Sequence, residues 1–335
     1  MKVSSIKTDL ESHASTVNEF ILKSLKGTPM ELYQASSHLV RTGGKRLRPF
    51  MVIKVCQMLG GTEKRALPAA AAVELVHNFT LVHDDIMDND EMRHGTATVH
   101  NYYGMPLAIL AGDILFSKSF ELLTFNGKKV GIPDSDIANM VAQLTRACTE
   151  ICEGQATDIG FASSSKLPNE EEYLDMIRKK TASLFEISCV LGAVSAPSHS
   201  ARDIANFSSF GRNIGIAFQL VDDLIGVVGD PKLTGKAAGN DIREGKKTYP
   251  ILLAIRKASE EDKDKIRKVF GSKSAPAADI KEAVKVISDI GIEQDIRSTA
   301  RQYVNDALKS IESYSNSDAR RSLQFSADFV VGRWL

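Results

Sequence analysis

Apolar residues recur with helical spacing over most of the chain. Ile280, Ala283, Val284 and Ile287 lie at relative positions 0, 3, 4 and 7, and a similar spacing continues from residue 296 to residue 311. Side chains with this spacing gather on one face of an α-helix and can pack against a protein core. The segment 68–92 shows no strand-like alternation of apolar and polar residues. The pattern therefore predicts helices.

Short breaks rich in glycine, proline or small polar residues separate these helical segments. They lie at residues 27–29, 60–62, 104–106, 127–133, 163–168, 196–200, 229–245 and 271–276. None is long enough for an interdomain linker. We therefore predict one all-α domain over residues 1–335, built as a large bundle of about ten to twelve helices.

The composition fits a folded globular protein. Length alone favours about two domains of ~150 residues each, but the chain contains no linker to separate them. Hydrophobic residues make up 43% of the chain and charged residues 25%, which excludes collagen-like and disordered proteins. The 42 basic and 42 acidic side chains cancel, so overall charge gives no reason to bind nucleic acid or an anionic membrane.

The cysteines and the apolar runs indicate a cytoplasmic location. Four cysteines in a chain of 335 residues form neither a disulfide framework nor a zinc pattern with histidines, which fits a reducing compartment. The first residues lack the apolar stretch of a signal peptide. No apolar run approaches the ~18 residues of a membrane span, so we expect no transmembrane segment.

An acidic segment, HDDIMDNDE, follows an apolar helical stretch at residues 83–91. On a helix Asp84 and Asp88 lie at i and i+4, where two like charges repel each other. A divalent cation would compensate them, and oxygen ligands with open coordination positions suit Mg²⁺. A solvated acidic helix end is the alternative that this segment alone leaves open.

A second aspartate pair strengthens the metal interpretation. Asp222 and Asp223 also follow an apolar helical run, in the segment FQLVDDLIGVVGD. Two such clusters in one helical protein favour facing metal ligands over two unrelated helix ends.

Local groups of cations accompany the two acidic segments. GGKRLRP, at residues 43–49, has three cations, and its paired glycines would allow the backbone to approach an anion closely. Basic side chains suit phosphate oxygens, so these groups predict a phosphorylated substrate. The cations are Lys45, Arg46, Arg48, Arg93, Lys179, Lys180, Lys236, Lys246 and Lys247.

The order of these motifs resembles that of the trans-type isoprenyl diphosphate synthases, the family of farnesyl and geranylgeranyl diphosphate synthases. The similar segments run in order: GGKRLRP, ELVHNFTLVHDDIMD, AGD, GQATD, KTA, FQLVDD, GKAAGNDIREGKKT and the weaker FSADFVVGR. The resemblance implies the isoprenoid synthase fold, with all motifs converging on a central cavity of one domain. It also implies a homodimer.

The resemblance carries roles to individual positions. It assigns Mg²⁺, as three ions per active site, to Asp84, Asp88 and Asp222, and catalysis to these aspartates with Lys180. It assigns the isopentenyl diphosphate site to Lys45, Arg48, His77 and His94. It assigns the allylic diphosphate site to Arg93, Lys180, Thr181, Gln219, Lys236 and Lys246, and lines the cavity with Gln155 and Asp158.

The implied reaction is Mg²⁺-assisted ionisation of the allylic diphosphate, alkylation by the double bond of isopentenyl diphosphate, and proton loss. Residues Phe79 and Thr80, just before the first acidic segment, are similar to those of enzymes that stop at C20, although helical spacing alone does not point Phe79 at the growing chain. A farnesyl (C15) product, a catalytically weakened partner subunit and a terpene cyclase are the alternatives. The cyclase would not need GGKRLRP for a second diphosphate.

Two positions depart from the family pattern. The family commonly has a third aspartate in the second acidic motif, where this chain has Gly226; Asp230 could reach the metals through water. The family also commonly has a second arginine after the first motif, where this chain has His94. These departures are what motivates the weakened-subunit alternative.

Histidine at position 94 predicts pH-dependent substrate binding. Because imidazole is only partly charged near neutral pH, the affinity for isopentenyl diphosphate should rise as pH falls toward the pKa of His94. The variant His94→Arg should lower the KM for isopentenyl diphosphate and remove this pH dependence. Steady-state kinetics across pH would test it, and an unchanged KM in the variant would contradict it.

Overall fold

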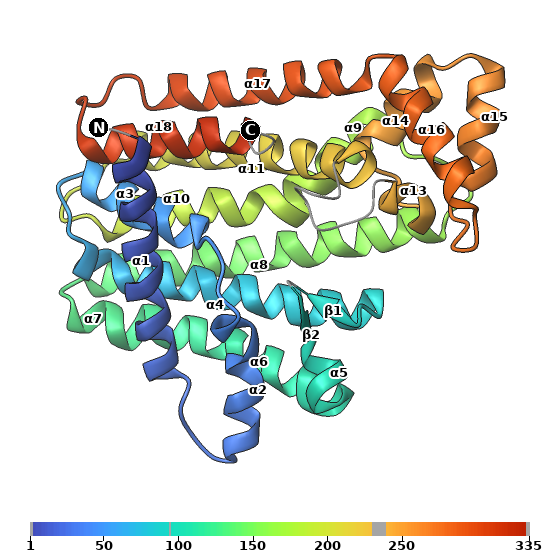
Figure 1. Cartoon of the computed structure of the whole chain (residues 1–335). Coiled ribbons are helices and arrows are strands. Elements are labelled where there is room, and N and C mark those ends of the chain that lie inside the picture. Colours follow the sequence, from blue (N-terminus) through green and yellow to red (C-terminus); the bar gives the residue numbers. More distant parts are fainter. Residues whose placement is uncertain (1–2, 94, 230–238, 333–335) are drawn as a thin grey trace. The chain divides into compact units, whose positions relative to one another are not determined.

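The computed structural model describes residues 3–93, 95–229 and 239–332, and in these ranges nearly every element is a helix (Figure 1). The all-α prediction is confirmed. Two compact units make up the chain, and we describe each by itself. Unit 1 comprises Met1–Cys148, Glu186–Ser208 and Ser313–Phe325; unit 2 comprises Thr149–Phe185, Ser209–Glu312 and Ser326–Leu335. One domain over residues 1–335 stays a prediction.

Unit 1 is built around a helix whose middle is rich in alanine. Residues 69–72 are all alanine and fully buried, and their small side chains allow other helices to approach closely. The first elements of the chain, in order, are α1 (Val3–Ser24), α2 (Met30–Arg41), α3 (Leu47–Met58), α4 (Glu63–Asp88), β1 (Met92–Arg93), β2 (Thr96–Ala97), α5 (Val99–Tyr103), α6 (Met105–Glu121), the π-helical turn η1 (Leu122–Asn126), α7 (Gly127–Lys129) and α8 (Asp134–Ser163).

Unit 2 contains the second half of α8 and most of the later helices. Its predicted amphipathic faces are confirmed, because Ile280, Ala283 and Ile287 are buried, as are Ile296 and Ala300 in the next helix. The remaining elements, some shared with unit 1, are α9 (Glu170–Ile177), the π-helical turn η2 (Arg178–Ala182), α10 (Ser183–Ser195), α11 (Ala201–Val228), α13 (Asn240–Glu244), α14 (Tyr249–Lys257), α15 (Glu260–Val269), α16 (Ala277–Asp289), α17 (Ile292–Ser310) and α18 (Asp318–Val331). Most of α10 and the first turns of α11 belong to unit 1.

The structure has more helical segments than the about ten to twelve expected from the sequence. Three of them, α5, α7 and α13, are only three to five residues long. Gly104, at φ 84°, separates α5 from α6, and the π-helical turns interrupt two longer helical stretches. The spacing of apolar residues does not reveal such short pieces, because it becomes visible only over several turns.

No helix in the described ranges is long and apolar enough to cross a membrane, as the apolar runs predicted. All four cysteines are free thiols. Cys56, Cys148 and Cys189 are buried, whereas Cys152 is exposed on α8. Burial raises the pKa of the Cys56 thiol to about 11.

Helix α8 approaches the turn η2 so closely that only glycine fits at the contact. A Cβ atom at Gly154, in the segment GQATD, would lie 2.8 Å from the Cα of Lys180 and 2.9 Å from the carbonyl carbon of Lys179. The obstructing atoms belong to the backbone, so a side-chain rotation cannot relieve the overlap. Gly154 therefore sets the distance between GQATD and the segment that carries Lys180.

We predict that Gly154→Ala lowers the free energy of unfolding by about 2 kcal/mol or more, because α8 and η2 must separate to admit the methyl group. Gly160→Ala on the same helix is the matched control. Nothing lies within 4 Å of a Cβ there, so the control should be neutral or up to about 1 kcal/mol more stable than the parent. Urea denaturation measures both, and equal stabilities would contradict the close approach.

Candidate functional site

The first acidic segment forms the carboxyl end of α4. Asp84 is half-buried and Asp88, exposed, is the last residue of the helix, which Asn89 ends with a left-handed conformation. Their predicted i, i+4 relation on a helix is confirmed. No basic residue lies in the last turn, and the helix dipole adds partial negative charge there. This end of α4 therefore attracts cations.

The two aspartates offer oxygen donors of the kind that Mg²⁺ prefers. In the ranges that the structure describes, no group of three or more histidine, cysteine, aspartate or glutamate side chains is arranged to hold a metal ion. Mg²⁺ does not require such a cage, because it keeps several waters and binds substrate phosphates through its open positions. Asp84 and Asp88 fit a metal that is held partly by its substrate.

Asp85, a residue that the sequence interpretation did not use, is buried and lies between Asp84 and Asp88 in the sequence. Its Oδ1 accepts a hydrogen bond from Nε of Arg93 at 2.5 Å. Burial raises the pKa of Asp85 to about 6, and the Arg93 guanidinium opposes this shift. The antiparallel pair β1–β2, in which Arg93 faces Thr96, turns Arg93 back toward α4. The buried carboxylate thus fixes the cation that was predicted to contact the allylic diphosphate.

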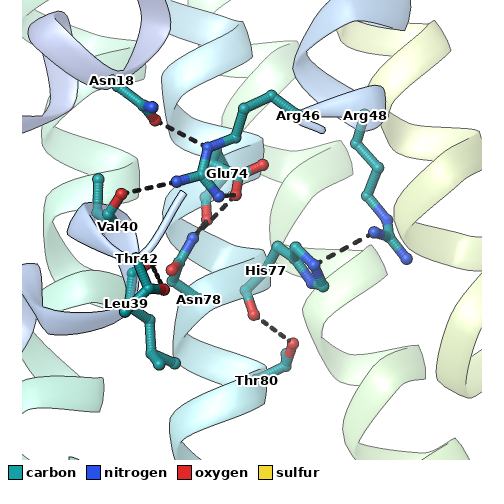
Figure 2. Close-up of polar contacts among 10 residues, drawn as sticks. All are labelled: Asn18, Leu39, Val40, Thr42, Arg46, Arg48, Glu74, His77, Asn78 and Thr80. Atoms are coloured by element: carbon teal, nitrogen blue, oxygen red, sulfur yellow. Dashed lines mark hydrogen bonds and ion pairs between the residues drawn. The ribbon is translucent and has the colours of Figure 1, made fainter. Parts of the chain in front are cut away.

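The described residues that are predicted to bind isopentenyl diphosphate lie on the loop before α3, in the first turn of α3 and on α4, and Figure 2 shows Arg48 and His77 among them. Lys45 is exposed, and Arg48 Nη1 lies 3.4 Å from Nε2 of His77. The structure brings Arg48 and His77 together, as expected if both bind isopentenyl diphosphate. Arg46 differs from its neighbours: it points into unit 1, toward the buried Glu74, and is not a surface cation.

The residues expected to set product length lie one to two turns before Asp84. Phe79 is half-buried, and its ring centroid lies 5.1 Å from that of Phe116 on α6. The ring centroid of Phe116 in turn lies 5.0 Å from that of Phe120, so the three rings form a row. Thr80 donates a hydrogen bond to the carbonyl oxygen of His77 at 2.8 Å. The row adds two aromatic residues that the sequence interpretation did not identify.

In unit 2 the adjacent aspartates of α11 face different environments. Asp222 is exposed, whereas Asp223 is buried and accepts hydrogen bonds from the hydroxyl of Tyr173 and, at 2.7 Å, from Nε2 of Gln219. Gln219 accepts from the hydroxyl of Thr181 at 2.8 Å. A continuous chain of hydrogen bonds therefore joins α9, η2 and α11, and it leaves Asp222 on the accessible side of the helix.

The environment of Asp223 indicates an anchoring role. Burial raises its pKa to about 7, an effect that the hydrogen bonds from Tyr173 and Gln219 oppose and that the nearby Asp241 reinforces. The pKa of Tyr173 is raised well above its usual value, by burial and by the Asp223 carboxylate. Tyr173 had no sequence signal, because it lies far from the motif along the chain.

Gly226, which departs from the family pattern, packs directly against the carboxylate of Asp241 on α13. A Cβ at position 226 would lie 2.6 Å from the Cγ of Asp241. The carboxylate of Asp241 therefore fills the space in which a side chain at position 226 would begin. With glycine at position 226, the acidic group beside this turn of α11 is the carboxylate of Asp241.

The remaining predicted cations have different surroundings. Lys180 on η2 forms an ion pair with Asp158 of GQATD, with Nζ 2.5 Å from Oδ2. Lys246 pairs with Glu244 at 2.9 Å on the surface. Lys247 instead donates to three carbonyl oxygens at residues 161, 164 and 166, and burial lowers its pKa. His94, Asp230 and Lys236 lie outside the described residues, so the roles predicted for them stay predictions.

Comparison with known proteins finds similarity to one protein family over most of the chain. The family model described as "Polyprenyl synthetase" matches residues 29–287. A geranylgeranyl diphosphate synthase of Sulfolobus acidocaldarius is 40% identical over 95% of this chain and 96% of its own length. A geranylfarnesyl diphosphate synthase of Aeropyrum pernix is 38% identical over 95% of this chain and 99% of its own.

A solved structure of high similarity is the geranylgeranyl pyrophosphate synthetase of Pyrococcus horikoshii. It is 38% identical to this chain, covers 99% of both chains and superposes with a TM-score of 0.91. The similarity therefore extends over nearly the whole length of the chain.

Proposed function

The chain belongs to the polyprenyl synthetase family, and on that premise we propose that it is a trans-prenyltransferase that condenses isopentenyl diphosphate with an allylic diphosphate and makes geranylgeranyl diphosphate (C20). One observation carries the proposal most directly. Within unit 1, the acidic end of α4 and the pair Arg48–His77 lie on and beside the same helix. Metal ligands and a separate diphosphate site are the two requirements of a reaction between two diphosphates.

The reaction needs charge stabilisation and no protein nucleophile. The allylic C–O bond breaks, and diphosphate leaves with the electron pair. The double bond of isopentenyl diphosphate attacks the allylic cation, and a proton is then lost to the released diphosphate. Mg²⁺, when bound, neutralises the negative charge that develops on the leaving group. We assign its ligands to Asp84, Asp88 and Asp222, whose carboxylates are exposed or half-buried.

The protein's own cations hold the diphosphates in place. We assign Arg93, Lys180 and Lys246 to the allylic diphosphate, together with Thr181, Gln219 and, outside the described residues, Lys236. Arg93 is oriented by Asp85, and Lys180 by Asp158. Such fixed cations cost no reorganisation when the leaving group separates. We assign Lys45, Arg48 and His77 to isopentenyl diphosphate, with His94 beyond the described ranges.

We further propose a cytoplasmic homodimer. The four free cysteines fit a reducing compartment. Met105, Ile109 and Leu110 on α6 and Tyr102 on α5 are large apolar residues that are 41 to 67% exposed. An apolar patch of this kind on a folded protein is typical of an interface, and a second copy of the chain would cover it.

The decisive experiment is to incubate the purified chain with Mg²⁺, labelled isopentenyl diphosphate and C5, C10 or C15 allylic diphosphates. We expect C20 as the main product, and light scattering on the same preparation should give the mass of two chains. A C15 product would support the farnesyl alternative. If Gly226 and His94 mark a weakened partner subunit, the chain alone should give no product. Cyclic hydrocarbons would support a terpene cyclase.

Product length should depend on Phe79. Because its ring heads the aromatic row on α4 and α6, we predict that Phe79→Ala opens the space beyond C20 and shifts the products to C25 or longer. A relative of this chain is itself named for a C25 product. The control is Phe125→Ala, whose ring is 68% exposed and should not alter product length. Chromatographic sizing of products measures both, and an unchanged profile in Phe79→Ala would refute the role.

A further inference from the structure

Arg46 adopts a backbone conformation that is unusual for a residue with a side chain. Its φ of 50° and ψ of 41° lie in the left-handed region, immediately before α3. The preceding Gly43 and Gly44 also have positive φ, of 90° and 137°. A Cβ at Gly44 would lie 3.0 Å from Nη1 of Arg46, so the glycine also makes room for the guanidinium. Strain of this kind persists only when other contacts hold the residue in place.

The side chain of Arg46 supplies those contacts. Only 8% of the residue is exposed, and its guanidinium donates to acceptors on three different helices (Figure 2). Nε donates to Oδ1 of Asn18 on α1 at 2.8 Å, and Nη2 donates to the carbonyl oxygen of Val40 on α2 at 2.8 Å. Nη1 donates to Oε1 of Glu74 on α4 at 2.7 Å. The planar guanidinium thus fixes the loop relative to α1, α2 and α4.

Glu74 is the negative charge at the centre of this network. It is 2% exposed, and Nδ2 of Asn78 donates to its Oε1 at 3.0 Å. Burial raises the pKa of Glu74, and the positive charges of Arg46 and Arg48 oppose that shift. A buried carboxylate that stays ionised requires such partners. Glu74 is therefore the direct counter-ion of Arg46, and the charge of Arg48 adds to its stabilisation.

The contacts of Arg46 with Asn18, Val40 and Glu74 form an anchor, and this anchor orients the cations that flank Arg46. Lys45 and Arg48 lie on either side of Arg46 in sequence; the first is exposed and the second reaches His77 on α4. We propose that Arg46 and Glu74 are positioning residues that hold Lys45, Arg48 and His77 in the arrangement that binds isopentenyl diphosphate. This inference rests on the proposed function. It gives Arg46 a role different from that of Lys45 and Arg48, since the guanidinium of Arg46 forms an ion pair with Glu74.

The test compares variants that alter the anchor with one that removes another buried cation. Arg46→Met removes the guanidinium, Glu74→Gln keeps the shape but removes the charge, and Arg46→Lys keeps the charge without the planar group. The milder Asn18→Ala removes one acceptor and covers the case in which a stronger variant does not fold. The control is Lys54→Met on α3, because Lys54 is equally buried and forms an ion pair with Asp9 at 2.7 Å.

Two measurements separate positioning from stability. Calorimetric titration with isopentenyl diphosphate alone gives its affinity, and steady-state kinetics give the KM for each substrate with kcat. For Arg46→Met, Arg46→Lys and Glu74→Gln we expect about a tenfold loss of isopentenyl diphosphate affinity and a matching rise in its KM, with the allylic KM and kcat within about twofold. Asn18→Ala should show a smaller loss. Lys54→Met should lower the melting temperature but leave both KM values unchanged.

Each outcome has a distinct meaning. Unchanged affinity in the folded anchor variants would overturn the positioning role, as would equal losses for both substrates. Full activity in Arg46→Lys would show that charge, and not the planar guanidinium, is what matters, and would also overturn it. If the unaltered protein neither binds isopentenyl diphosphate nor makes product, the proposed function itself fails, whatever the variants do.

Discussion

Carboxylates buried beside the site must be compensated inside the protein, and this requirement organises both units. An ionised carboxylate in the interior is costly unless cations and hydrogen-bond donors surround it. Glu74 has Arg46, Asp85 has Arg93, and Asp223 has two neutral donors. Arg46, Arg93 and Tyr173 each come from another element of the chain, whereas Gln219 lies on α11 together with Asp223. The buried acids thereby connect the elements that carry the proposed substrate contacts.

Adjacent aspartates on a helix have different surroundings because successive helical residues point in directions about 100° apart. In the pair Asp84–Asp85 and in the pair Asp222–Asp223, the second residue is buried and bonded, while the first keeps access to solvent. The anchored acid holds its helix turn in place, and the accessible acid is the one that we propose as a metal ligand. The same arrangement recurs in two helices far apart in sequence, one in each unit.

Glycines, which have no side chain, are as important to these arrangements as the charged residues. Gly112 lets α6 approach His83 on α4, where a Cβ would overlap the imidazole ring. Gly154 brings α8 to the backbone of Lys180, and Gly226 leaves space for another carboxylate. Protein interiors are packed closely enough that a methyl group at position 154 would force α8 and η2 apart, whereas at position 112 or 226 it would displace the His83 ring or the Asp241 carboxylate. The position 226 that departs from the family pattern is therefore part of the packing of this chain.

The sequence by itself determined the helical class, the positions of most breaks and the motifs that carry the chemistry, because these depend on spacing along the chain. The i, i+4 relation of Asp84 and Asp88 needed only a helix. Only the tertiary structure decided that Arg46 points into unit 1 while the adjacent Lys45 is exposed. It also decided which aspartate of a pair is anchored and that Tyr173 holds Asp223. Those directions depend on partners that are distant in sequence, so no local pattern can encode them.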